Sequence, residues 1–186
     1  MTGSFRIEGQ AIASEDGMIA DSTGLMPNSL KFPSDQKEYE QALDRATILV
    51  NGRLSYEWQA SSPRRRRLVV TRRVVGLAPD PDNPNARLWN PAGAPIEEAC
   101  ASLGVKTGEI AVIGGTFVFS LFLAIGYDAF HLSHAPGVRL PGGVPVFREQ
   151  KTGRSPEEVL AGAGLKAGPV RRFDDGVTIV AWTRSA

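Results

Sequence analysis

The sequence predicts an α/β domain built on one central, mostly parallel sheet. Short β-rich runs alternate with helical patterns along the 186 residues. Between Thr47 and His134 these runs are separated by crossovers instead of two-residue turns, which favours parallel pairing with helices on both faces. An Asp-Gly hairpin signal in Phe173–Val177 adds an antiparallel pair at the carboxyl end. A chain of this length is expected to form one domain, residues 1–186.

Seven runs read as strands, and with the hairpin the sheet is expected to hold about eight. The runs are Phe5–Ala13, Thr47–Asn51, Leu68–Thr71, Arg87–Trp89, Glu109–Ile113, Ala129–His134 and Val177–Thr183. Five prolines lie between Gly76 and Pro95, so that stretch is expected to be an excursion loop.

Boundary signals mark two helices in the second half of the chain. Pro95 fits the first position of a helix that Gly104 stops, and Cys100 lies on its apolar face. Ser155 begins a capping box, with a proline in the first helical position after it. These helices are expected to pack on the sheet.

Composition excludes several classes of protein. Hydrophobic residues make up 42% of the chain and charged residues 22%, far from the values of disordered or collagen-like chains. A formal net charge of +1 gives no reason to expect a nucleic-acid or membrane-surface partner. The longest apolar stretch, 114–125, is shorter than the roughly 20 residues that span a bilayer. We expect a small-molecule substrate as the partner, no nucleic acid, no membrane, and a homodimer.

Cysteine content and the amino terminus bear on location. Cys100 is the single cysteine and cannot form an internal disulfide, and Met1–Ile7 lacks the pattern of a signal peptide. We therefore expect a cytoplasmic protein. The basic run Arg64–Arg67 has no interleaved aromatic residues and is interpreted as a solvated face. His131 and His134 have no cysteine or acidic residue at ligand spacing, so no metal site is expected.

Two glycine-containing segments follow strands. Gly114-Gly115 ends an apolar strand and precedes the helical run Thr116–Ala124, where close backbone approach and unpaired N–H groups suit a pyrophosphate. Gly52–Ser55 also follows a strand, is expected to open a short helix, and offers a second phosphate site. Arg53 and Arg72 follow strands whose carboxyl ends should be neighbours, a place to grip the 2′-phosphate that distinguishes NADPH from NADH.

One carboxylate stands out near the amino end. Ser34 is expected to cap a helix that runs to about Arg45, which puts Asp35 in its first turn. Taken alone, an acid at that position is most often a solvated residue that the helix dipole favours.

These motifs occur in a fixed order, and in that order the chain resembles the dihydrofolate reductase superfamily, which includes the reductase domain of bacterial riboflavin synthesis. The matching pieces are Ala13–Ile19, Leu25–Pro27, Pro33–Asp35 with Tyr39, Asn51–Glu57, Val69–Arg72 and Val112–Phe119. They fall within roughly Phe5 to His134. The resemblance implies a dihydrofolate-reductase-like fold, a cis peptide bond between Gly114 and Gly115, and an NADPH-dependent oxidoreductase.

The resemblance also implies roles for individual residues. Asp35 is implied as the catalytic carboxylate, which pairs with a ring nitrogen and amino group of a pterin-like substrate and supports proton delivery during hydride transfer. The implied substrate-binding residues are Tyr39, Met26, Arg65, Ile113 and Phe119. The implied cofactor-binding residues are Ile12, Ile19, Gly52, Arg53, Leu54, Ser55, Thr71, Arg72, Gly114, Gly115, Thr116, Phe117 and Val118, with NADPH as the cofactor.

Three positions depart from the dihydrofolate enzymes of that superfamily. Asn28 stands where tryptophan is usual, and Phe119 stands where tyrosine is common. The segment Pro141–Phe147 lies where a threonine normally supports the acid, and it contains none. Three functions therefore stay open: a reductase of a dihydrofolate-type ring, a riboflavin-pathway reductase of a ribosylaminopyrimidine, and a catalytically silent NADPH-binding module.

Overall fold

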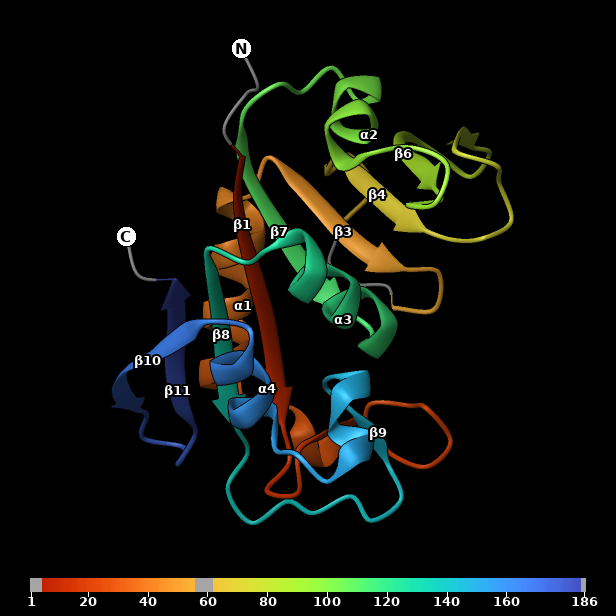
Figure 1. Ribbon diagram of the computed structural model, residues 1–186. Coiled ribbons are helices and arrows are strands. Elements are labelled where there is room, and N and C mark those ends of the chain that lie inside the picture. Colours follow the sequence, from red (N-terminus) through yellow and green to blue (C-terminus); the bar gives the residue numbers. More distant parts are fainter. Residues whose placement is uncertain (1–4, 56–61, 185–186) are drawn as a thin grey trace.

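The computed structural model describes residues 5–55 and 62–184 (Figure 1). The strands of its main sheet are β1 (Phe5–Ala13), β3 (Ile48–Gly52), β4 (Arg67–Val70), β5 (Leu77–Asp80), β6 (Asn83–Trp89), β7 (Gly108–Gly114), β8 (Ala129–His134), β10 (Leu165–Arg172) and β11 (Thr178–Arg184). The described residues thus form a nine-stranded sheet in the order β10-β11-β8-β1-β7-β3-β4-β6-β5. All pairings from β8 to β6 are parallel, and the pairings at both ends are antiparallel.

Helices cover both faces of this sheet. Helix α1 (Pro33–Arg45) lies on one face, whereas α2 (Ile96–Ser102), α3 (Thr116–Ile125) and α4 (Pro156–Gly162) lie on the other (Figure 1). A small second sheet pairs β2 (Met18–Ala20) with β9 (Val144–Pro145). Short 3-10 helices span Asn28–Leu30, Ser62–Arg64 and Arg148–Thr152. No helix in the described ranges is both long and apolar enough to cross a membrane.

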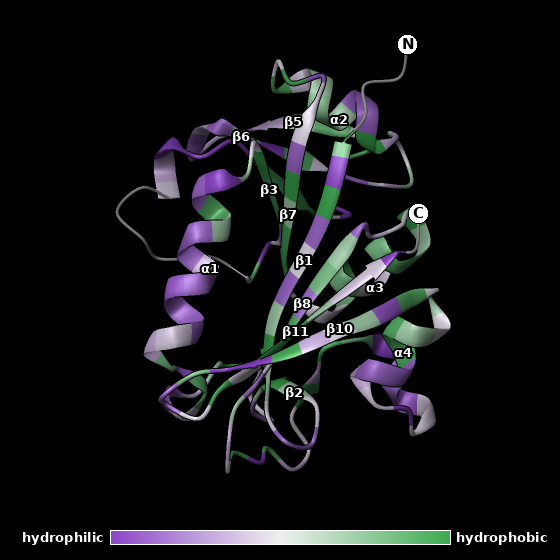
Figure 2. Ribbon diagram, turned by 90° about the vertical axis from the view of Figure 1, so that its left-hand side faces the viewer, coloured by the Kyte–Doolittle hydropathy of each residue, from purple (hydrophilic) through white to green (hydrophobic). Residues whose placement is uncertain are grey.

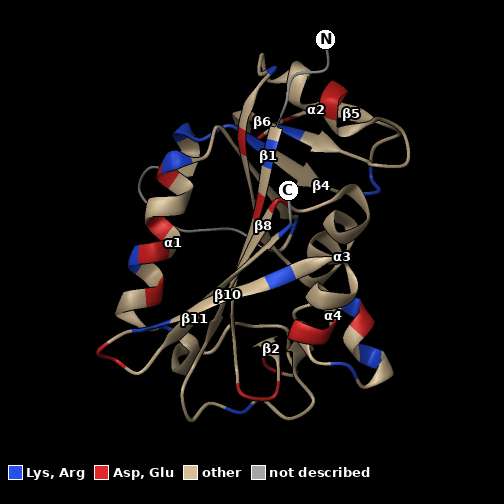
Figure 3. Cartoon of the chain, turned by 60° about the vertical axis from the view of Figure 1, so that its left-hand side comes forward, with Lys and Arg blue, Asp and Glu red and all other residues tan. Residues whose placement is uncertain are grey.

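Hydropathy explains how α1 packs. The helix is hydrophilic over most of its surface (Figure 2) and carries charges of both signs (Figure 3), and its buried residues are Ala42 and Leu43. Leu43 packs on Leu49 of β3 and Ala111 of β7. A helix with one narrow apolar stripe belongs at a surface. Only one side of α1 is therefore fixed to the sheet.

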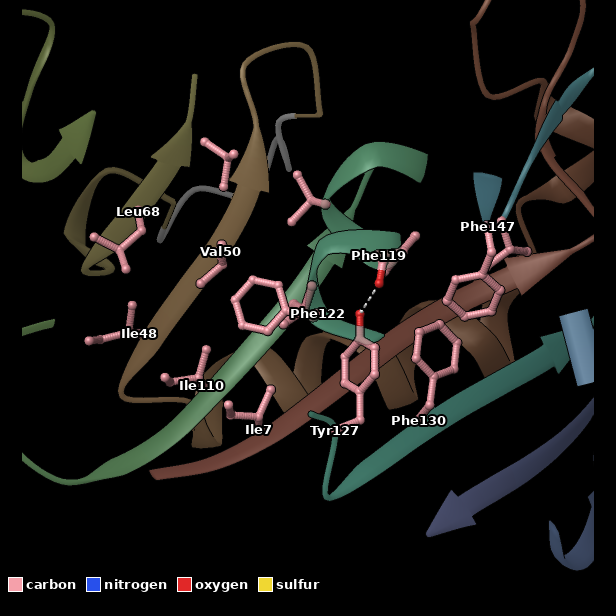
Figure 4. Close-up of a cluster of buried hydrophobic side chains, with 14 of the residues drawn as sticks. Ile7, Ile48, Val50, Leu68, Ile110, Phe119, Phe122, Tyr127, Phe130 and Phe147 are labelled. Carbon is pink, nitrogen blue, oxygen red and sulfur yellow. Dashed lines mark hydrogen bonds between the residues drawn. The ribbon is translucent and has the colours of Figure 1, made fainter. Parts of the chain in front are cut away.

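The largest core cluster lies between the sheet and α3. Most of its aromatic rings come from α3, from Tyr127 and Phe130 at the start of β8, and from the segment after β9 (Figure 4), and Trp89 of β6 also belongs to it. Phe119 packs edge-on against Phe130, with ring centroids 5.4 Å apart, and the Tyr127 hydroxyl donates a 3.1 Å hydrogen bond to the Phe119 carbonyl. Edge-to-face rings add to the stability that burial itself supplies. Gly9 of β1 provides the space that the Phe130 ring occupies.

Most predicted strands are confirmed. The bounds of β1 and β8 agree with the prediction at both ends, and those of β3, β4, β7 and β11 agree within one residue. The predicted parallel sheet and the carboxyl-terminal hairpin are also confirmed. The count of about eight is one short, because β5 was not expected.

The stretch Gly76–Pro95 was wrongly expected to be a loop. It forms the β5–β6 hairpin at the sheet edge. Proline is tolerated on an edge strand because only one side of that strand joins a ladder, and Pro79 lies on such a strand. The turn itself is stabilised by the Asp82 N–H, which donates to the Asp80 carboxylate at 3.0 Å.

Helix starts were predicted with mixed success. The Ser155 capping box is confirmed. The Ser155 hydroxyl accepts from the Glu158 N–H at 3.2 Å, and the Glu158 carboxylate accepts from the Ser155 N–H at 2.8 Å. Pro95 is the N-cap of α2 instead of its first residue. Ser34 is not the N-cap of α1. The N-cap is Phe32, whose side chain makes no capping hydrogen bond, and the helix begins at Pro33.

The basic run Arg64–Arg67 is not uniformly a solvated face. Arg67 is the first residue of β4 and is 1% exposed. Its guanidinium donates to the Asn51 side chain at 2.8 Å and to the Ser62 hydroxyl at 3.1 Å. A buried cation requires such partners. The interpretation is therefore wrong for Arg67.

Candidate active site

The predicted cofactor residues gather at one edge of the sheet. The carboxyl ends of β1, β3, β4 and β7 share this edge, because these strands are parallel neighbours. In α/β folds, ligands bind beyond the carboxyl ends of such strands. The turn after β7 and the turn after β3 face each other here, and they form the centre of the candidate site.

Backbone forms the surface between these two turns. A Cβ atom on Gly115 would lie 3.1 Å from the Ser55 hydroxyl, and one on Gly52 would lie 3.5 Å from the Val118 side chain. Gly114 has a φ of +111°, a conformation that favours glycine. The Gly114-Gly115 peptide bond is cis, as the resemblance implied. The residues present thus fit a group that approaches the backbone closely, as a phosphate does.

The start of α3 adds donors to this surface. The first bond of the helix runs from the Phe119 N–H to the Gly115 carbonyl, at 3.0 Å. The N–H groups of Thr116, Phe117 and Val118 therefore have no acceptor within the helix. Gly115 provides no side-chain cap, and the first turn carries no acidic residue. An anion is the complement of such a helix end.

Two exposed arginines lie at the adjoining strand ends. Arg53 follows β3 and Arg72 follows β4, and Gly52 pairs with Val70 where these strands are neighbours. Among the residues that the structure describes, neither arginine has an ion pair. Thr71, between Val70 and Arg72, is buried and its hydroxyl accepts from the Arg73 N–H at 3.2 Å.

The segment after Gly52 differs from the expected helix where it is described. The Ser55 N–H donates to the Gly52 carbonyl at 2.9 Å, which closes a turn. Leu54 projects from this turn and is 85% exposed. Tyr56 and Glu57, the last residues of the motif, lie outside the described residues.

An arginine that sequence reasoning missed lies beside α3. The Arg148 guanidinium stands over the Phe117 ring, 5.6 Å from its centroid, and the Arg148 N–H donates to the Ser120 hydroxyl at 2.9 Å. The Thr116 hydroxyl donates to the Pro145 carbonyl on the same side of the helix. Arg148 thus extends from Ser120 back toward the helix start. No local signal could have revealed this position, because it depends on packing between segments distant in sequence.

Asp35 lies in the first turn of α1, against the end of β8. The hydroxyl of Ser133, a strand residue that is 3% exposed, lies beside this carboxyl. The pKa of Asp35 is raised to about 6, mainly by burial and also by the Asp175 and Glu38 carboxylates, against the opposing effect of the Ser133 hydroxyl. A carboxyl that changes charge near neutral pH can carry a proton during a reaction.

Ser133 corrects an expectation. Pro141–Phe147 contains no threonine, and the hydroxyl that lowers the pKa of Asp35 comes instead from Ser133 of β8. Alternation along β8 turns Ser133 toward the face that α1 covers. The serine in Phe130–His134 was the only available signal, and a single polar residue in a strand does not reveal its partner.

The substrate residues are divided between two places. Tyr39 and Ile113 pack in one cluster on the α1 face of the sheet. Because Tyr39 is one helical turn after Asp35, and Ile113 immediately precedes Gly114, this cluster adjoins both the acid and the glycine turn. Met26 is exposed in the loop before α1.

Two other predicted substrate residues lie elsewhere. Arg65 pairs with Asp44 at 2.6 Å, near the opposite end of α1 from Asp35, about 13 Å along the helix. Phe119 is 2% exposed and belongs to the aromatic core, and its ring lies under the glycine turn, 3.2 Å from where a Cβ atom on Gly114 would stand. Among the predicted cofactor residues, Ile12 is buried beside Leu30, and Ile19 packs on the main core.

The two histidines have acidic partners from distant segments. His131 pairs with Glu8 at 3.1 Å, and His134 pairs with Glu157 at 3.0 Å. The His131 bond and Arg6 hold the pKa of Glu8 near 2 against the opposing effect of burial. Within residues 5–55 and 62–184, no group of three or more metal-binding side chains is found.

Ser133→Ala is expected to raise the pKa of Asp35 above about 6, because the hydroxyl that stabilises the carboxylate is lost. A titration of the Asp35 carboxyl carbon by NMR measures this directly. Ser133→Thr keeps the hydroxyl and suits a strand, so it should restore the original midpoint. A midpoint that falls or stays in Ser133→Ala would contradict this role of the hydroxyl.

Solved structures of other proteins share this fold at low sequence identity. A putative riboflavin biosynthesis protein from Shewanella sp. PV-4 aligns over 97% of this chain and 99% of its own, with a TM-score of 0.67 and 19% identity. A pyrimidine reductase-like protein from Corynebacterium diphtheriae aligns over 97% and 92%, with a TM-score of 0.66 and 13% identity.

A longer protein shows the same fold over part of its length. It is the diaminohydroxyphosphoribosylaminopyrimidine deaminase/5-amino-6-(5-phosphoribosylamino)uracil reductase from Thermotoga maritima, with a TM-score of 0.63 and 16% identity. The alignment covers 97% of this chain and 56% of that one. No protein-family model and no curated protein sequence matches the chain. The chain therefore shares the fold of these structures, and this fold agrees with the one that its motif order predicted.

Proposed function

We propose that this chain is an NADPH-dependent reductase of the riboflavin-pathway type, which reduces the ribosyl group of a ribosylaminopyrimidine at C1′. One observation carries the proposal: a backbone cradle suited to phosphate adjoins a carboxyl group that changes charge near pH 6. Gly114 and Ile113 are consecutive in β7, and they link the cradle to the cluster beside Asp35. The similar structures are those of riboflavin-biosynthesis and pyrimidine-reductase proteins, and this likeness supports the substrate class.

The chemistry required of this chain is positioning and proton delivery. NADPH supplies a hydride when bound, and the hydride forms the new C–H bond at C1′ of the opened ribosyl group, which is joined to the pyrimidine amino nitrogen as an imine. The C=N π electrons move to that nitrogen, which takes a proton and becomes a secondary amine. Asp35, protonated below about pH 6, is the group proposed to supply that proton, directly or through water. Gly115 and the α3 N–H groups are proposed to hold the pyrophosphate.

Parallel assays test the substrate. NADPH consumption is measured with a ribosylaminopyrimidine, with its 5-phosphate, and with dihydrofolate. We expect kcat/KM to be roughly a hundredfold higher for one of the ribosylaminopyrimidines than for dihydrofolate, a difference of about 2.7 kcal/mol in the barrier. Equal rates, or faster reduction of dihydrofolate, would contradict the proposal.

A dihydrofolate-type ring is the second candidate substrate. The Ser133 hydroxyl beside Asp35 favours it, because the resemblance implies a supported acid in the dihydrofolate enzymes. Preferential turnover of dihydrofolate in the same assays would select this candidate. A catalytically silent module would instead show a rise in Tm with NADPH and no turnover of any substrate.

Arg72→Ala and Arg53→Ala are expected to weaken NADPH binding while leaving NADH binding unchanged. A charge-assisted hydrogen bond contributes about 1.5–3 kcal/mol, so each loss should raise the NADPH Kd by roughly 10-fold to 100-fold. Calorimetric titration with both cofactors measures this. Lys106→Ala removes an exposed cation near the opposite edge of the sheet and serves as the control. Equal loss of NADH affinity would refute the 2′-phosphate assignment.

A further inference from the structure

The carboxyl-terminal hairpin is bonded to the start of α1. The turn between β10 and β11 contains Asp175, and its carboxylate accepts from the Ser34 N–H at 3.0 Å and from the Ser34 hydroxyl at 2.7 Å. The two residues are 141 positions apart. Figure 3 shows the acidic turn beside the amino-terminal end of α1. Asp175 therefore provides the helix-start acceptor that the residues before α1 do not.

A second contact joins the same elements. Arg171 of β10 donates through both terminal nitrogens to the two oxygens of Glu38, at 3.0 and 3.1 Å. Its guanidinium also lies over the Phe173 ring, 5.1 Å from the centroid. Bidentate pairing of this kind fixes orientation as well as distance. Ser34 and Glu38 bracket Asp35 along α1, so both contacts constrain the turn that carries it.

Charged and polar groups reach Asp35 from each element packed around it. Asp175 acts from the hairpin, Glu38 from α1 itself, and Ser133 from β8. Asp175 and Glu38 are acids and favour the protonated form of Asp35, whereas the Ser133 hydroxyl favours the ionised form. Arg171 partly offsets the charge of Glu38. The partners of Asp175 within residues 5–55 and 62–184 are uncharged donors, namely the Ser34 groups and the Val177 N–H.

We propose that Asp175 is a positioning residue for Asp35: from the hairpin turn, its carboxylate holds the Ser34 N–H and hydroxyl and so anchors the first turn of α1, which carries Asp35. Its importance for turnover rests on the proposed function. The contact between Asp175 and α1 is independent of the proposed function, because Tm and the pKa of Asp35 can be measured without any enzymatic turnover. The hairpin thus belongs to the active-site structure although no hairpin residue was predicted to lie there.

Asp175→Asn tests the effect of charge, because the amide oxygen can still accept from the Ser34 N–H while the negative charge is gone. NMR titration of the Asp35 carboxyl carbon should show its midpoint at lower pH than in the unaltered protein. Above that midpoint, kcat/KM should fall roughly threefold or more, since the rate follows the protonated fraction. Asp175→Ala removes the acceptor as well, and should lower kcat further and reduce Tm.

Asp174→Asn is the matched control. Asp174 precedes Asp175 in the same turn and is exposed. Its substitution by asparagine changes the net charge by the same amount, but Asp174 is not among the groups that shift the pKa of Asp35. Its Asp35 midpoint should not move. An unchanged midpoint in Asp175→Asn, or an equal shift in both variants, would overturn the proposal. If no variant turns over any substrate while the Asp175→Asn midpoint still falls, the proposed function fails and the role of Asp175 stands.

Discussion

Asp35→Asn is expected to lower kcat/KM by about 100-fold to 10,000-fold, the range that a positioned proton donor contributes. Asparagine has the shape of aspartate and can still accept from Ser133, but it cannot deliver a proton. The loss should therefore appear at every pH. With it, the decline in rate that we expect above about pH 6 should disappear, because that decline follows the ionisation of Asp35.

The same substitution should make the folded protein more stable at neutral pH. Asp35 has a folded pKa near 6 against an ordinary value of 3.8, so the folded state binds the proton more tightly than the unfolded state. Stability then falls as pH rises from about 4 to about 6, and the penalty persists above that range. Asparagine removes a penalty of at most about 3 kcal/mol, with a gain in Tm of roughly 2–4 °C per kcal/mol.

Thermal unfolding at pH 7.5 and at pH 4 separates the two effects of Asp35→Asn. The gain in Tm should be present at the higher pH and nearly absent at the lower one, where the aspartate is already protonated. Asp174→Asn provides the control for a change in net charge. A variant that is less stable than the unaltered protein at pH 7.5, or that keeps full activity, would show that Asp35 is an ordinary surface acid.

Gly9→Ala is expected to destabilise the fold by about 3 kcal/mol or more. A Cβ atom there would lie 2.3 Å from the Phe130 ring and 2.8 Å from the Tyr127 ring, and both rings are fully buried in the main core. Overpacking a core typically costs about 1–3 kcal/mol, and here two rigid rings must move together. β1 is also bonded to β7 and β8 at Gly9, so the strand cannot shift away.

Urea unfolding measures the effect of Gly9→Ala, as a lower midpoint with an unchanged slope. Gln10→Ala is the control, because the next residue of β1 points to the opposite face of the sheet. It should change the free energy of unfolding by less than about 1 kcal/mol. A Gly9→Ala variant as stable as this control would mean that the ring packing around Gly9 is looser than described.

The sequence by itself predicted the features that short-range signals specify. Alternation gave correct bounds for β1 and β8, and the Ser155 capping box was correct because both of its partners lie within four residues. Motif order also predicted the fold and the cis peptide after Gly114. These signals act within one element or at one strand end, so they can be seen before the chain is folded.

Only the tertiary structure decided which groups surround Asp35. Its hydroxyl partner Ser133 comes from β8, and the acid that anchors its helix, Asp175, comes from the last hairpin. Arg67 likewise became a core residue through contacts with Asn51 and Ser62. A side chain's burial and charge state depend on segments that are distant in sequence. The order of motifs could therefore predict Asp35 as the acid, but its pKa near 6 follows from packing alone.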